Sequence, residues 1–138
     1  MKKVVVSQMA VLALACVSCS KKNVYPVSGK VTYHGSPASG ATVFFQRPGG
    51  AAMNDHMMMG IVQEDGSFEM VTGLPGKGVP PGAYDVLIQW RRVRKQGKGR
   101  PQPGPDVLKG RYADPKRPLL HATVEAKPTI LPPFELTD

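Results

Sequence analysis

The sequence predicts an all-β protein, a single antiparallel β-sandwich of about seven strands that follows an N-terminal signal peptide. Three observations predict this fold. Short segments of alternating apolar and polar residues recur along the chain, and clusters of turn-forming residues separate them. No segment after the signal has the 3.6-residue period of an amphipathic helix. Gly and Pro number 15 and 14 among 138 residues, and 41% of the residues are hydrophobic, which suits a packed domain rich in turns.

The first 22 residues are typical of an export signal. Two lysines precede the uncharged stretch from Val4 to Ala15, and small residues follow. This stretch is shorter than the roughly 20 residues that a transmembrane helix needs, and two further lysines close it. The expected organisation is a signal peptide over 1–15, a lipidated tether over 16–24 and one domain over 25–138.

A cysteine at the end of the signal indicates a lipoprotein. Ala13-Leu14-Ala15 before Cys16 resembles a bacterial lipobox, and Cys19 is the alternative acylated position. Several acyl chains would hold the protein firmly on a membrane, since each buried CH₂ contributes about 0.8 kcal/mol. We therefore expect an exported protein, attached to a membrane of the cell envelope by its N-terminal lipid. Cleavage with free secretion, or a redox or zinc pair of the two cysteines, are the alternatives.

The first strands are predicted from alternation. Residues 27–33 place Val27, Val31 and Tyr33 on one face, and a turn over 34–37 ends the strand. A second strand covers 41–46. A hairpin is expected over 60–71 around Glu64-Asp65-Gly66, with Phe68 and Met70 pointing inward.

The second half of the domain begins with the clearest alternation in the chain, from Tyr84 to Trp90. Residues 91–105 are basic and rich in Gly and Pro, which predicts an open loop. Two last strands are expected over 119–125 and 129–136. Pro132-Pro133 interrupts the latter, and because proline donates no ladder hydrogen bond, this strand is predicted at a sheet edge.

Three motifs in order resemble the carboxypeptidase regulatory-like, or transthyretin-like, domain family. The pattern G-x-V-x-x-x-G-x-P-x-x-G-A-x-V matches from Gly29 to Val43. Asp65-Gly66-Ser67-Phe68 resembles the family's D-G-x-F hairpin, and Pro81-Gly82-Ala83-Tyr84 its P-G-x-Y motif. The resemblance implies a transthyretin-like, immunoglobulin-like sandwich in a small bacterial lipoprotein. The buried ring of Tyr84 is expected to send its hydroxyl to nearby backbone, as in a tyrosine corner.

The resemblance implies no activity, because such domains are usually accessory or adhesive modules. The hydroxyisourate hydrolases of this family carry a C-terminal Tyr-Arg-Gly-Ser, whereas this chain ends Phe-Glu-Leu-Thr-Asp. The sequence contains no G-x-S-x-G nucleophile elbow and no HExxH metal spacing. We therefore expect a non-catalytic protein without a cofactor.

The positive charge is concentrated in one segment. Ten Lys and Arg lie between Arg91 and Arg117 against two Asp, while the rest of the mature chain is close to neutral. A basic loop over 91–111 is therefore the expected contact surface for an anionic polysaccharide or an envelope protein, with no nucleic acid expected. The alternatives are a carbohydrate-binding module that uses an exposed Trp90, and a merely solvated loop around a core Trp90. The predicted partner-binding residues are Trp90, Arg91, Arg92, Arg94, Lys95, Lys98 and Arg100.

A methionine-rich stretch carries the third hypothesis. His56 precedes Met57, Met58 and Met59, and thioethers with an imidazole suit Cu(I). A periplasmic copper-binding protein is thus a further alternative. The opposing interpretation is that these methionines pack against the edge of the sandwich.

Overall fold

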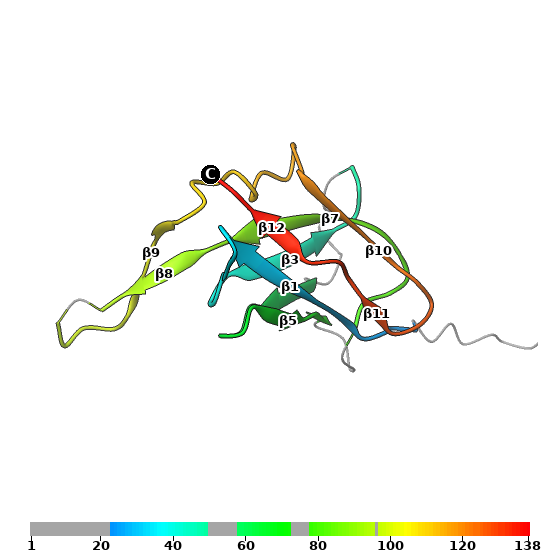
Figure 1. Cartoon of the computed structure of the whole chain (residues 1–138), viewed down its shortest axis with the longest axis horizontal. Helices are drawn as coiled ribbons and strands as arrows, with labels where there is room; N and C mark the ends of the chain where they lie inside the picture. The colour runs from blue at the N-terminus through cyan, green and yellow to red at the C-terminus, as the bar shows by residue number, and fades with distance from the viewer. Residues whose placement is uncertain (1–22, 50–57, 73–77, 96) are drawn as a thin grey trace, which may run out of the picture.

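The computed structural model describes residues 23–49, 58–72, 78–95 and 97–138. These residues form two facing β-sheets and a two-stranded ribbon, with no helix among them (Figure 1). Accordingly, no described helix could cross a membrane. The strands are β1 (Val27–Tyr33), β2 (Ser36–Pro37), β3 (Thr42–Gln46), β4 (Met58–Ile61), β5 (Ser67–Glu69), β6 (Val71–Thr72), β7 (Gly82–Gln89), β8 (Arg91–Arg94), β9 (Gln102–Asp106), β10 (Leu120–Val124), β11 (Thr129–Ile130) and β12 (Phe134–Leu136).

The larger sheet has the order β10-β7-β3-β4-β6 and is antiparallel throughout. Its strands alternate as the sequence predicted. In β3, Val43 and Phe45 are buried while Phe44 lies on the outer face, and in β7 Tyr84, Val86 and Ile88 point into the core. The hydroxyl of Tyr84 donates to the Pro80 carbonyl at 2.7 Å, so the expected tyrosine corner is confirmed.

The smaller sheet is built around β1. On one side β5 and β2 pair with β1 in antiparallel fashion, and on the other β11 and β12 pair with it in parallel. The strand predicted over 129–136 thus lies at an edge, as expected, and Pro132-Pro133 divides it in two. Its parallel pairing with the first strand departs from the predicted antiparallel sandwich. No local turn joins these two strands, so the sequence pattern held no signal of their orientation.

The segment 60–71 is only partly the predicted hairpin. The turn forms, since Gln63 donates to the Ser67 carbonyl at 2.7 Å and Gly66 has a φ of 86°. Beyond the turn the chain leaves its partner: β5 pairs with β1 in the other sheet, and only β6 returns to β4. The chain therefore closes one side of the sandwich by changing sheets.

The core lies between the two sheets. Phe68 and Met70 point inward as predicted, each 1% exposed. Phe68 stacks on Phe134 of the same sheet at a centroid distance of 6.3 Å. Burial of these apolar side chains is the main stabilising contribution, at about 1.5–3 kcal/mol for each large side chain. Other buried members are Val27, Val31, Val43, Phe45, Val86, Ile88, Val124, Leu131 and Leu136.

Candidate functional site

The basic segment forms a β-hairpin and not the predicted open loop. β8 and β9 pair in antiparallel fashion with Arg91 opposite Asp106 and Arg94 opposite Gln102. The ribbon projects beyond both sheets, as the strands β8 and β9 in Figure 1 show. We call residues 91–106 the basic arm. The prediction of a loop was wrong because the glycines and prolines of the segment lie mainly in the connection and in β9, where strand pairing tolerates them at an edge.

The exposed charged side chains of the arm are all positive. Its six Lys and Arg are all exposed, and none of them takes part in an ion pair within the described part of the chain. They are the predicted Arg91, Arg92, Arg94, Lys95, Lys98 and Arg100. The structure therefore brings six of the seven predicted partner-binding residues onto one projecting element. Their side chains repel one another, which an anionic partner would relieve.

The seventh predicted residue, Trp90, belongs to the core. It is 8% exposed, and its indole Nε1–H donates to the Ser39 carbonyl at 2.9 Å. The guanidinium of Arg92 lies over the ring, 5.4 Å from its centroid. An exposed Trp90 that stacks on sugars is thus contradicted by its burial, and the alternative of a core tryptophan is confirmed.

The carboxylate of Asp106 holds the arm where it joins the sandwich. The Asp106 carboxylate accepts the backbone N–H of Trp90, Leu108 and Gly110, each at 3.0 Å. Val107 also donates to the Trp90 carbonyl at 2.7 Å. These contacts fasten both ends of the arm to the sandwich, and the Asp106 carboxylate is occupied by backbone N–H groups.

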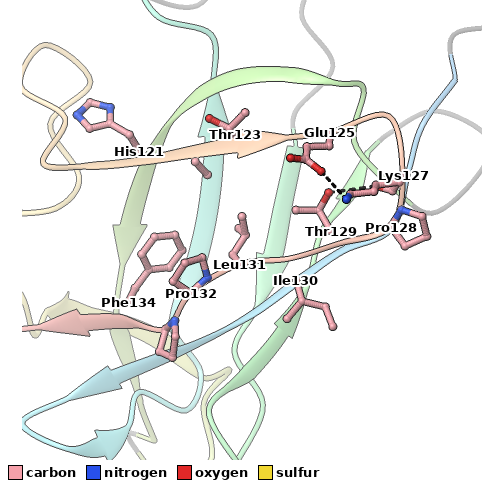
Figure 2. A pocket seen from close by; sticks show the side chains of 12 residues that line it. His121, Thr123, Glu125, Lys127, Pro128, Thr129, Ile130, Leu131, Pro132 and Phe134 are labelled. Atoms are coloured by element: carbon pink, nitrogen blue, oxygen red, sulfur yellow. Dashed lines mark hydrogen bonds and ion pairs between the residues drawn. The ribbon is translucent and has the colours of Figure 1, made fainter.

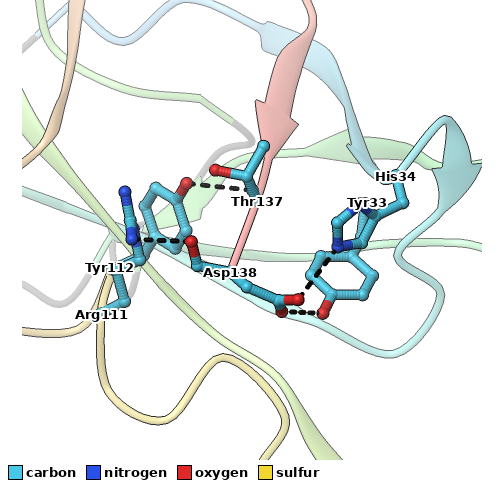
Figure 3. A network of polar contacts seen from close by, with 6 residues as sticks. All are labelled: Tyr33, His34, Arg111, Tyr112, Thr137 and Asp138. Carbon is cyan, nitrogen blue, oxygen red and sulfur yellow. Dashed lines mark hydrogen bonds and ion pairs between the residues drawn. The ribbon is translucent and has the colours of Figure 1, made fainter.

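A second polar cluster lies beside the base of the arm, at the end of β1 (Figure 3). Asp138 accepts a hydrogen bond from the Tyr33 hydroxyl, and its other carboxylate oxygen lies 3.4 Å from His34 Nε2. Arg111 Nη1 donates to the Asp138 carbonyl at 2.7 Å. The Tyr33 ring in turn meets the Trp90 ring edge to face, with centroids 5.5 Å apart. Sequence reasoning missed this cluster, because its members are far apart in the chain and belong to no motif.

The groups around Asp138 stabilise the ionised form of its side-chain carboxylate. The hydrogen bond from Tyr33 and the charge of His34 lower the pKa of the Asp138 carboxyl below its ordinary value. The same hydrogen bond raises the pKa of the Tyr33 phenol, because the bond favours the protonated form. Lys109 acts on Asp138 in the same direction as His34, and Arg92 acts favourably on the ionised form of Tyr33.

A groove of about 700 Å³ opens between the free edge of β10 and the edge formed by β11 and β12 (Figure 2). His121 stands at one end of it, and its Nδ1 lies 2.9 Å from Oδ1 of the buried Asp85. Lys127 and Glu125 form an ion pair at the other end. In the lining, Thr129 donates to the Lys127 carbonyl, and the described partner of His121 is Asp85 and not a threonine. Among the described residues of this groove, no hydroxyl group is hydrogen-bonded to a histidine that could activate it as a nucleophile.

Of the four residues predicted as copper ligands, the two that the structure describes, Met58 and Met59, do not point toward one another. Met58 is 6% exposed and points into the core, whereas Met59, the next residue of β4, faces the opposite side of the sheet. This separation contradicts a shared Cu(I) site for those two residues. His56 and Met57 lie outside the described residues, as do Cys16 and Cys19. Among the residues with defined positions, no group of three or more His, Cys, Asp or Glu is placed to hold a metal ion.

No family model matches this chain, and no curated protein matches it at a significant level.

Proposed function

We propose that this chain is a non-catalytic lipoprotein of the cell envelope that attaches to an anionic partner through its basic arm. The observation that carries the proposal is the arm itself: a projecting ribbon with six exposed cations that form no ion pair among the described residues. The family proposal made from the sequence motifs, a transthyretin-like domain of small exported lipoproteins, is consistent with it. Both proposals describe a module that binds and does not catalyse.

The arm suits electrostatic attachment for two physical reasons. Its cations are exposed, so a partner can reach them without opening the fold. Its base is held by the three hydrogen bonds of Asp106, so less conformational freedom is lost on binding than for an unstructured loop. Attraction between the arm and a polyanion would be weakened by salt, since the Debye length is about 10 Å at 0.1 M.

The position of the arm favours a partner away from the anchoring membrane. The chain enters the domain beside the start of β1, where Val27 pairs with Thr129. The arm lies at the opposite end of β1, next to Tyr33, as Figure 1 shows. Seven residues of strand separate these ends by about 20 Å. A lipid on Cys16 would hold the N-terminal end of the domain toward the membrane, and on this proposal the arm faces envelope polymers or proteins.

Attachment is tested with the full chain and isolated cell-envelope fragments. We expect co-sedimentation at low salt that is lost at high salt. The triple variant Arg92→Gln, Arg94→Gln and Lys95→Gln should lose most of the binding. A matched variant with the same charge change outside the arm, Lys30→Gln, Lys116→Gln and Arg117→Gln, should keep it. Equal losses in both variants would show that net charge and not the arm governs binding, and no binding at low salt would refute the proposed function.

The lipid anchor is tested separately by metabolic labelling with a radioactive fatty acid in a bacterial host. The proposal expects label in the full chain that Cys16→Ser removes and Cys19→Ser leaves. Label lost only in Cys19→Ser would move the anchor to the alternative position. An unlabelled full chain would contradict the lipoprotein assignment and leave the arm proposal to its own experiment.

A further inference from the structure

The cluster at the end of β1 resembles a binding site that already holds a ligand. Donors from two parts of the chain converge on one residue. The Tyr33 hydroxyl and His34 Nε2, at the end of β1, contact the side chain of Asp138, and Arg111 contacts its carbonyl. Figure 3 shows these side chains turned toward Asp138 from both sides. His34 lies in the tight turn after β1. The φ angles of His34 and Gly35 are 47° and 79°, and two consecutive positive φ angles are typical of a type I′ turn.

Positive charge surrounds the position of the carboxylate. Lys109 and Arg111 line a small hollow of about 260 Å³ together with Asp138. Arg92 of the basic arm reaches the same region, since it stacks on Trp90, which in turn contacts Tyr33. The cationic surface of the arm therefore adjoins this cluster, and Asp138 is the one acid of the cluster among the described residues.

We propose that Tyr33, His34 and Arg111 form a receptor for a ligand carboxylate, that Asp138 occupies this receptor as an internal competitor, and that the receptor and the basic arm together bind an acidic polysaccharide. This inference rests on the proposed function of the arm and names its ligand. The occupant is exchangeable because it is exposed: the side chain of Asp138 is 73% accessible and that of His34 is 55% accessible. A ligand carboxylate can therefore take its place without unfolding of the sandwich.

The composition of the surface favours a polysaccharide over a protein partner. Stable protein interfaces bury apolar and aromatic anchors at their centre. The arm offers one large exposed hydrophobic residue, Val93, at 64% exposure, and its aromatic neighbour Trp90 is buried. A polymer with a carboxylate on every sugar needs no such anchor, since cations along the arm and hydroxyl and imidazole donors at its base meet its repeating charges.

The test uses the full chain and fragments of polygalacturonate as the probe, with binding measured by calorimetry at low salt. Asp138→Ala should bind about three- to tenfold more tightly, because the ligand no longer displaces an internal carboxylate. Asp114→Ala is the matched control, since it also removes one negative charge, that of a half-buried residue, but lies outside the cluster. Adding Tyr33→Phe to Asp138→Ala should cancel the gain without a change in charge. Dextran sulfate, which carries no carboxylate, should bind Asp138→Ala and Asp114→Ala equally.

Failure of the receptor and failure of the arm give different results. Equal gains in Asp138→Ala and Asp114→Ala would overturn the receptor and leave the arm intact. If no variant bound polygalacturonate, the polysaccharide ligand would be refuted, and retained co-sedimentation with envelope fragments would assign the arm to an acidic protein. The receptor is then judged by NMR: galacturonate should shift the His34 ring resonances in Asp138→Ala and not after the added Tyr33→Phe. An unchanged His34 would overturn the receptor as well.

Discussion

The Asp106 carboxylate accepts the backbone N–H of Trp90 at 3.0 Å, and through this contact the last residue of the basic arm is bonded to the residue that precedes its first. The two residues are 16 positions apart. Trp90 directly follows β7, the longest strand of the sandwich, and its ring is buried in the core. Asp106 bonds the returning strand to this fixed residue. The basic arm, which projects into solvent, is in this way fixed by one buried ring and one carboxylate.

Asp106→Ala should lower the free energy of unfolding by about 2–3 kcal/mol, because three backbone N–H groups lose their acceptor. Urea denaturation at neutral pH measures this. Asp114→Ala is the control, since Asp114 accepts one exposed backbone N–H from Lys116, and its cost should stay near 0.5–1 kcal/mol, at the lower end of the usual range. Similar costs for both variants would mean that the arm is not fastened by Asp106.

Trp90→Ala should destabilise the fold by about 3–5 kcal/mol, as expected for the loss of a buried aromatic side chain. Trp90→Phe keeps a ring in place but loses the hydrogen bond to Ser39, and should cost less. Thermal unfolding followed by circular dichroism distinguishes the two. A Trp90→Ala protein with unchanged stability and lost sugar binding would return the indole to the role of a sugar platform.

Gly60→Ala should cost more stability than Gly29→Ala, although both glycines are buried in strands. A Cβ at Gly60 would lie 2.7 Å from the backbone carbonyl oxygen of Glu69, which cannot move without breaking the change of sheet at β5. A Cβ at Gly29 would meet the edge of the Phe68 ring at 2.9 Å, and a side chain can turn aside. We expect losses of about 3 and about 1 kcal/mol, the two ends of the range for overpacking. The reverse order in urea denaturation would contradict the described path of the chain.

The contact between Tyr33 and Asp138 should be visible in the titration of Asp138. Its pKa is lowered in the folded protein, chiefly by the hydrogen bond from Tyr33. The stabilising contribution is therefore present above the ordinary value of 3.8 and is lost as the pH falls through the depressed folded pKa. NMR of the carboxyl carbon should show a midpoint below 3.8 that rises in Tyr33→Phe. An unchanged midpoint in that variant would show that Tyr33 does not hold Asp138 in solution.

Local patterns predicted the main strands, although about seven were expected and twelve short ones are described. The segment Val27–Tyr33 is a strand with the predicted bounds, and the inward direction of Phe68 and Met70 followed from alternation alone. The arm was missed as a strand pair because its polar, exposed residues have no apolar face to mark a period. The cluster around Asp138 was missed for a different reason. Tyr33 and Asp138 are 105 positions apart, and only the packing of β12 beside β1 brings them together.

The sequence by itself determined the class of the fold, the position of most strands and the concentration of charge in one segment. These properties depend on side-chain period, turn chemistry and composition, which are local. The tertiary structure decided which strands pair, and hence that the first and last strands run in parallel and that Trp90 is buried. It also decided that the cations stand on a fastened ribbon beside the cluster around Asp138. Pairing between distant segments depends on the packing of the whole core, and no local pattern encodes it.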